Sequence, residues 1–272
     1  MSEPDLFHES SGTGPTMVLL HGLTAVGTQV VHGSHRLERA GHRVVTYDAR
    51  SHGDSAAPPT DIPMQEAYSY EALASDLGRI VEITVPDRED FWLAGSSMGA
   101  HTIARYALDQ PDRIAGLVLI GPAYAGGDPD AADLAVWNAL SEGLRNEGGE
   151  GFVRAYEESL RTTDDWRERL VALARDRIGL HSDHRALADA LQWIPRSRPF
   201  QEVEELGSLE MPALVIGSDD SADPGHPLAV AEAWSAAIPA AELHRDEPGA
   251  TPTAWSGGRL SGLIADFAAL HA

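Results

Sequence analysis

The chain contains no cysteine and no lysine among its 272 residues, and its 20 basic side chains are all arginine. The absence of cysteine excludes thiolate nucleophiles, disulfides and cysteine metal sites. The absence of lysine excludes a Schiff base, a Ser-Lys dyad and the lysine contact of a phosphate-binding P-loop. The reactive side chains that remain are serine, carboxylate and histidine.

Positive charge and long apolar runs are also scarce. With 42 acidic and 20 basic side chains, the formal net charge is −22, which repels nucleic acids and anionic lipid surfaces. No run approaches the roughly 20 apolar residues that a membrane span needs, and residues 1–9 lack the basic and then apolar order of a secretory signal. We therefore expect a cytoplasmic protein that acts on a small molecule, with no nucleic-acid or membrane partner.

The apolar residues predict an α/β fold with a mostly parallel central sheet flanked by helices. Short β-branched runs alternate with helical patterns, and continuous apolar strands of this kind are buried on both faces. An antiparallel edge strand is expected near 5–10 and a last strand near 242–245. The remaining strands are predicted at 16–20, 43–48, 91–95, 115–120 and 213–217, and the helices at 29–40, 70–85, 97–108 and 258–270.

Residues 121–212 separate two predicted strands and are too many for a plain crossover. Their helical, charged pattern predicts a cap inserted at about 125–205 into a single domain that spans residues 1–272. Such a cap would cover the carboxyl ends of the strands, where ligands of open parallel sheets bind. Among the aromatic residues of this segment, we expect three to contact the substrate: Tyr124, Trp137 and Trp193. The alternative is that these side chains only pack within the cap.

The strand at 91–95 runs into the sequence Gly95-Ser96-Ser97-Met98-Gly99, and a helical pattern follows. Glycines on both sides of Ser97 predict a sharp strand-to-helix turn with close backbone approach. The nucleophile would be Ser97, held out at the tip of the turn. The alternative is a serine that merely caps the helix.

A second loop stands at the right place to complete such a site. The strand at 16–20 leads into His21-Gly22-Leu23-Thr24, where the amide of Leu23 can point toward the same space as the amide of Met98. Two such donors form an oxyanion hole for a tetrahedral intermediate. We expect His21 to fix this loop, and we expect His21, Gly22 and His101 to lie beside the substrate.

Three segments together resemble the successive signatures of the α/β-hydrolase superfamily. They are Leu20-His21-Gly22, the run Tyr47-Asp48-Ala49-Arg50-Ser51-His52-Gly53-Asp54-Ser55, and Gly95-Ser96-Ser97-Met98-Gly99. The resemblance implies the α/β-hydrolase fold and assigns the middle segment to a structural turn. It also implies a catalytic acid after the strand at 213–217, and the residue that matches is Asp220.

The chain departs from that family at the catalytic histidine. Relatives place this histidine after the last strand, where the present chain reads Pro248-Gly249-Ala250-Thr251-Pro252. We therefore expect His226, in the loop after the strand at 213–217, to be the base, with His101 as a further candidate. The acid that orients it would be Asp220, with Asp219 and Asp223 as alternatives, and their spacing supports no metal site.

These residues predict a serine hydrolase that acts on a small carboxylic ester or a related acyl compound, without metal or cofactor. Two alternatives remain open at the level of the sequence. One is a non-hydrolytic relative that keeps the pocket for ligand binding, as the missing histidine suggests. The other is a lyase in which the substrate supplies the base.

Overall fold

The centre of the protein is a seven-stranded sheet with the order β1-β3-β2-β4-β5-β6-β7. The structure is a computed structural model that describes residues 3–219 and 223–272. Only β1 pairs antiparallel with its neighbour, and the other neighbours pair in parallel. The strands are β1 (His8–Gly12), β2 (Thr16–Leu20), β3 (Arg43–Tyr47), β4 (Phe91–Ser96), β5 (Ile114–Ile120), β6 (Ala213–Gly217) and β7 (Ala241–Arg245).

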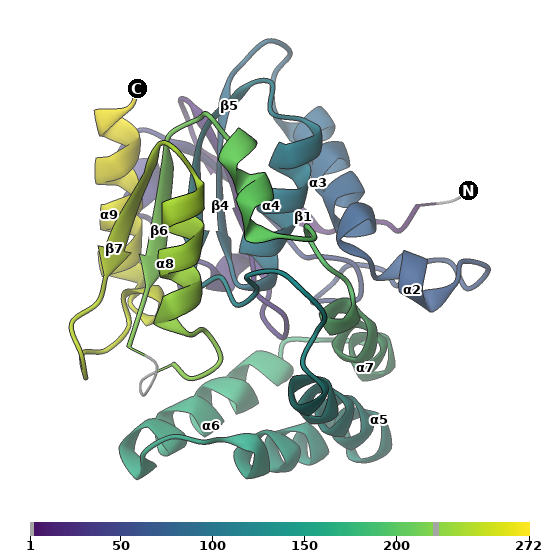
Figure 1. Ribbon diagram of the computed structural model, residues 1–272. Helices are drawn as coiled ribbons and strands as arrows, with labels where there is room; N and C mark the ends of the chain where they lie inside the picture. Colours follow the sequence, from purple (N-terminus) through teal and green to yellow (C-terminus); the bar gives the residue numbers. More distant parts are fainter. Residues whose placement is uncertain (1–2, 220–222) are drawn as a thin grey trace.

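Helices cover both faces of this sheet (Figure 1). One face packs against α3 (Tyr70–Thr84), α4 (Met98–Asp109) and α8 (Leu228–Ala237), and the other packs against α1 (Arg36–Arg39) and α9 (Gly257–Leu270). Alternate residues of β2 serve the two cores, since Val18 and Leu20 belong to the first and Met17 and Leu19 to the second. Every position of β2 and β6 is buried, which explains why these strands read as continuous apolar runs.

The chain segment that connects β5 to β6 forms three further helices, which we call the helical layer. They are α5 (Ala131–Ser159), α6 (Asp164–Ile178) and α7 (His184–Trp193). Figure 1 shows them together on one side of the sheet. The layer has its own apolar core, to which Leu144, Phe152, Ile178 and Leu187 belong. The short elements are α2 (Met64–Ala67), η1 (Gly27–Gln29), η2 (Ile194–Arg196), η3 (Val203–Ser208) and η4 (Thr253–Trp255).

The predicted α/β-hydrolase fold is confirmed, and most predicted strands match the structure closely. The helix expected over residues 29–40 was wrong. That segment contains only the turn η1 and the four-residue helix α1. Between them, His32 and Gly33 adopt positive φ angles of 47° and 69°, a left-handed conformation that a right-handed helix cannot continue through.

Across residues 3–219 and 223–272, no helix combines the length and the apolar composition that crossing a bilayer would require.

Candidate active site

Ser97 occupies the junction between β4 and α4 in a strained backbone conformation. Its φ of 52° and ψ of −113° lie in a region that non-glycine residues rarely adopt. Although Ser97 is the N-cap residue of α4, its side chain makes no capping hydrogen bond. Its amide donates to the carbonyl of Ile120 at 2.8 Å, which ties the turn to the end of β5. The half-buried hydroxyl is therefore held at the tip of the turn and is not used to cap the helix.

The two flanking glycines are required by crowding in this turn. A Cβ on Gly95 would lie 2.6 Å from the carbonyl carbon of Gly99, and a Cβ on Gly99 would lie 2.7 Å from that of Leu20. These separations are too short for real atoms, so helix α4 starts directly against the ends of β4 and β2. The structure therefore has the sharp strand-to-helix turn that the sequence predicts.

The loop after β2 lies directly beside Ser97. A Cβ on Gly22 would be 3.3 Å from the Cβ of Ser97. His21 holds this loop, because its Nε2 accepts the Ala49 amide at 2.9 Å and its Nδ1 donates to the Gly22 carbonyl at 2.8 Å. Within the described chain, the amides of Leu23 and Met98 make no hydrogen bond to a protein acceptor. Two unengaged amides thus lie in the loop after β2, beside the serine, and at the first residue of α4, directly after it.

His226 and Asp223 form a hydrogen-bonded pair in the loop between β6 and α8. The Nδ1 of His226 donates to Oδ1 of Asp223 at 2.9 Å, and the two side chains are 28% and 13% exposed. Burial lowers the pKa of His226, whereas the charge and the hydrogen bond of Asp223 raise it, and the net shift is upward. Asp220, which the sequence favoured as the acid, lies outside the described residues.

The His226 ring reaches the end of β5, where Ser97 is anchored. A Cβ on Gly121 would lie 3.4 Å from Cγ of His226, so the imidazole packs over this glycine. Gly121 directly follows Ile120, whose carbonyl accepts the Ser97 amide. The imidazole and the serine therefore belong to the same edge of the sheet, while the Ser97 hydroxyl makes no hydrogen bond to any residue that the structure describes.

His101, the other histidine considered as a base, is fully engaged within the protein. Its Nε2 accepts the Ala123 amide at 3.0 Å, so its Nδ1 carries the proton and donates to the Tyr70 hydroxyl at 2.9 Å. Burial, together with the charge of His226, lowers the pKa of His101 to about 3. These bonds make His101 a neutral packing residue with no ring nitrogen left for Ser97.

The loop after β7 begins with Asp246, a buried carboxylate. Asp246 accepts the Thr253 amide at 2.7 Å and the Thr253 hydroxyl at 2.5 Å. His244 lies on β7 itself, 3.5 Å from Asp246. The hydrogen bonds of Asp246 hold the loop in shape, because they join its first residue to the start of η4.

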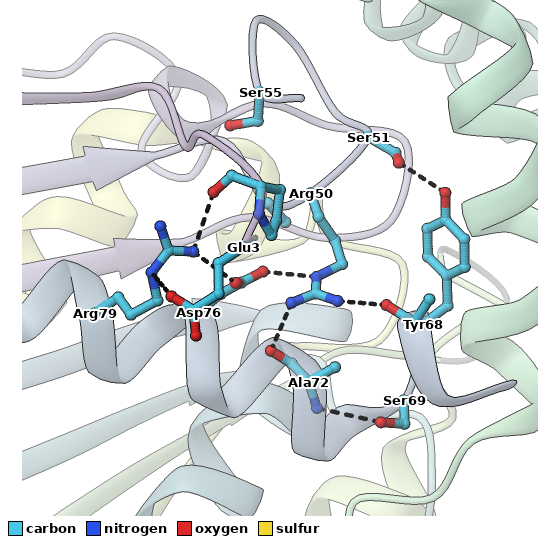
Figure 2. A network of polar contacts seen from close by, with 12 residues as sticks. Glu3, Arg50, Ser51, Ser55, Tyr68, Ser69, Ala72, Asp76 and Arg79 are labelled. Carbon is cyan, nitrogen blue, oxygen red and sulfur yellow. Dashed lines mark hydrogen bonds and ion pairs between the residues drawn. The ribbon is translucent and has the colours of Figure 1, made fainter. Parts of the chain in front are cut away.

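The middle signature, residues 47–55, serves as a scaffold. Asp48 accepts the amides of Gly27 at 2.8 Å and Asp54 at 3.0 Å. Figure 2 shows Arg50 reaching Asp76 and the carbonyl of Ala72, at 2.7 Å and 3.0 Å. The network joins the loop after β3 to helix α3.

The other residues predicted to contact substrate are held by the protein itself. The Tyr124 hydroxyl donates to the carbonyl of Gly127 at 2.8 Å, and the Trp193 ring lies 5.6 Å from the Arg196 guanidinium carbon. Trp137 packs on the core of the helical layer. All three are partly buried.

Contacts between the helical layer and the site were not foreseen from the sequence. His181, directly after α6, accepts the Gly53 amide at 2.9 Å and donates to the Thr24 carbonyl at 2.9 Å. Its ring also continues a row of buried histidines, with ring-centre distances of 5.0 Å from His21 to His52 and 5.6 Å from His52 to His181. The sequence carries no signal for these contacts, because the partners are 128 and 157 positions apart.

Comparison with known proteins places the chain among proteins of this architecture. Over 124 residues it is 36% identical to an sn-1-specific diacylglycerol lipase of Mus musculus, an alignment that covers 44% of this chain and 37% of the lipase. The chain spans between 37% and 55% of the length of the first curated relatives that it matches.

Two solved structures superpose over nearly the whole chain. The enol-lactonase of Burkholderia xenovorans is 24% identical with a TM-score of 0.75, covering 97% of this chain and 96% of its own. A bromoperoxidase of Bacillus anthracis is 25% identical with a TM-score of 0.72, covering 98% and 94%. The model of the alpha/beta hydrolase fold family matches residues 15–254. This match, together with the sheet order and the strand-to-helix turn, shows that the chain belongs to the alpha/beta hydrolase fold family.

Proposed function

We propose that the protein is a serine hydrolase that acts on a small carboxylic ester or a related acyl compound. The observation that carries the proposal is the strained Ser97, whose hydroxyl makes no capping bond to α4. A backbone strain of this kind costs about 1–3 kcal/mol and persists where the surrounding structure fixes it. Here the crowded glycines of the turn provide that constraint.

The proposed reaction begins with attack of the Ser97 oxygen on the acyl carbon. His226 accepts the serine proton through Nε2, since its Nδ1 is committed to Asp223. The amides of Leu23 and Met98 stabilise the negative charge on the acyl oxygen, and one such donor is typically worth about 2.7–4 kcal/mol in the barrier. The proton then passes to the leaving alcohol, and water releases the acid from Ser97 by the reverse sequence.

Asp223 has two roles in this scheme. Its hydrogen bond fixes the tautomer of His226, leaving Nε2 free to accept a proton. Its charge favours the imidazolium that forms when the serine loses its proton. The base and the orienting acid thus come from a single loop, consistent with a triad that is defined by geometry and roles.

We further propose that the helical layer is a cap over the site. Support comes from the contacts of His181 with Thr24 and Gly53, which join the end of α6 to the loops after β2 and β3. A cap in this position would exclude water and select the acyl or alcohol part of the substrate. Several relatives, among them the mouse lipase, are hydrolases by name, which favours the same class of chemistry.

The test is hydrolysis of a panel of short 4-nitrophenyl esters by the parent protein and by Ser97→Ala. The parent is expected to turn over esters with a short acyl chain, and Ser97→Ala is expected to lose about 10³-fold or more. Ser96→Ala is the matched control, because it removes the adjacent hydroxyl and leaves Ser97 in place. Equal rates for the parent and Ser97→Ala would overturn the proposal.

A non-hydrolytic ligand-binding protein is the second candidate, favoured by the Asp246 and Thr253 contact in the loop that carries the histidine of relatives. It predicts no covalent labelling of Ser97 by a fluorophosphonate and no turnover of activated esters. A lyase would also lack ester turnover and would be recognised by its products. Labelling of Ser97 together with ester turnover excludes both.

A further inference from the structure

We propose that Arg177 binds a carboxylate of the substrate, so that the preferred substrates are esters or lactones that carry a second, ionised acid group. This inference rests on the proposed active site for its location. It adds to that proposal a substrate class and the residue that selects it.

Arg177 has no partner for its charge within the described chain. Its Nε is inaccessible to solvent and makes no hydrogen bond. Other arginines of the helical layer are paired, as Arg175 is with Glu150 at 3.2 Å and Arg145 with Asp189 at 2.7 Å. A buried guanidinium nitrogen without an acceptor costs free energy unless a bound anion compensates for it.

The end of α6 that carries Arg177 is fixed against the site. Ile178, the next residue, is buried in the core of the helical layer. His181, four positions beyond Arg177, is hydrogen-bonded to Thr24 in the loop that carries Leu23. At the other end of α6, the Trp166 ring lies 5.4 Å from Trp255 in η4. Helix α6 therefore extends between the loops that follow β7 and β2.

The charge of Arg177 acts on groups of the proposed active site, namely His226 in the loop after β6 and His21 in the loop after β2. Burial lowers the pKa of Arg177, while electrostatic interactions with Tyr156 and Asp223 oppose that shift. In turn, the positive charge of Arg177 opposes the net upward shift in the pKa of His226 and adds to the lowering of the pKa of His21, which burial dominates. No ion pair joins Asp223 to Arg177 among the described residues, and Oδ1 of Asp223 is engaged with His226.

A carboxylate is the ligand that this environment fits. A guanidinium stays charged in proteins and can bind both oxygens of a carboxylate with two parallel hydrogen bonds. The protein as a whole, with a net charge of −22, repels small anions. A cation that has no partner among the described residues and that acts on the pKa of His226 would reverse that repulsion locally and orient an acid-bearing substrate.

The experiment compares two esters that differ only in this group. One is the 4-nitrophenyl monoester of glutaric acid, and the other is 4-nitrophenyl 5-methylhexanoate, in which an isopropyl group replaces the carboxylate. For the parent, kcat/KM is expected to favour the glutarate ester. In Arg177→Gln this preference, measured as the ratio of kcat/KM for the two esters, is expected to fall about 10- to 100-fold. Arg175→Gln, on the same helix, is the matched control and should keep the parental preference.

The ratio between the two esters is insensitive to the amount of folded protein, so a partly unfolded variant cannot imitate the result. If both esters are hydrolysed and Arg177→Gln keeps the parental preference, the Arg177 proposal is wrong while the serine hydrolase proposal stands. If neither ester is hydrolysed and Ser97 resists a fluorophosphonate, the proposed function fails. Calorimetric titration with glutarate then decides on Arg177: binding that weakens at least tenfold in Arg177→Gln supports the site, and no binding, or equal binding, overturns it.

Discussion

The Nδ1 of His226 and the Oδ1 of Asp223 are 2.9 Å apart, three positions from one another in the same loop. This pair gives the chain an imidazole held by a carboxylate although the loop after β7 contains no histidine. The imidazole packs over Gly121, next to the residue whose carbonyl holds the Ser97 amide. In the proposed mechanism, a single loop after β6 therefore replaces two loops as the source of the base and the acid.

Replacement of His226 by alanine is expected to lower kcat for a 4-nitrophenyl ester by about 10²- to 10⁴-fold, the usual range for a lost general base. Binding of substrate should change much less, because the cap and the oxyanion loop are untouched. Steady-state kinetics measure both. The control is His244→Ala, on β7, which should retain most of the activity, and loss of activity in His244→Ala alone would assign the base to that residue.

The pH dependence of kcat/KM reports the state of His226. A base must be neutral, so activity is lost as the pH falls through its pKa, which lies above the ordinary value of 6.5. Asp223→Asn removes the charge that raises this pKa, and the acidic limb should therefore move to lower pH while the plateau also falls. A limb that stays in place in Asp223→Asn would contradict the role of this carboxylate.

The crowding at the turn predicts a stability effect. A Cβ at Gly99 would lie 2.7 Å from the carbonyl carbon of Leu20, so Gly99→Ala should destabilise the fold by about 1–3 kcal/mol or more. Denaturant unfolding measures this loss. Gly258→Ala is the matched control, because no atom lies within 4 Å of a Cβ there. It should be neutral or stabilising by up to about 1 kcal/mol, and similar losses at the two positions would contradict the argument.

The buried histidines predict a loss of stability in mild acid. Burial lowers the pKa of His52 and His181 and brings that of His21 to about 4. Their stabilising contribution is complete above the unfolded value near 6.5 and is lost as the pH falls toward about 4, because only the unfolded chain takes up protons in that window. Each such histidine contributes at most about 1.4 kcal/mol per pH unit.

Urea unfolding between pH 6.5 and 5 measures this slope where carboxylates scarcely titrate. His52→Gln removes the middle ring of the row and should make the slope shallower, whatever it does to stability at neutral pH. His8→Gln, at an exposed position of β1, is the control and should leave the slope unchanged. If the free energy of unfolding of the parent does not change over this pH range, the pKa values of the buried histidines are not lowered as proposed.

The sheet could be predicted from the sequence because its signals are local. The run Ala213–Gly217 is apolar at every position, as a strand buried on both faces requires, and it forms β6 with the same bounds. The turn at Ser97 was equally readable, since its crowding leaves room only for glycine at two fixed positions. The absence of a long helix at 29–40 could not be predicted, because no local sequence signal indicates the positive φ of His32.

The rest of the site depends on contacts between distant segments. Three aspartates, at positions 219, 220 and 223, precede His226, and the sequence alone did not indicate that Asp223 reaches this histidine. In the sequence, Arg177 is indistinguishable from the other arginines of a charged helix. The structure distinguishes it from Arg175, because its buried Nε has no hydrogen-bond partner among the described residues. Whether an arginine is paired depends on how the helical layer packs, and no local sequence pattern predicts that packing.

Reaction with a fluorophosphonate, followed by intact-mass measurement and peptide mapping, tests the central claim most directly. We predict one adduct per chain, located on Ser97, formed more slowly in His226→Ala and absent from Ser97→Ala. An adduct on another residue, or ester turnover that persists without any adduct on Ser97, would contradict the account.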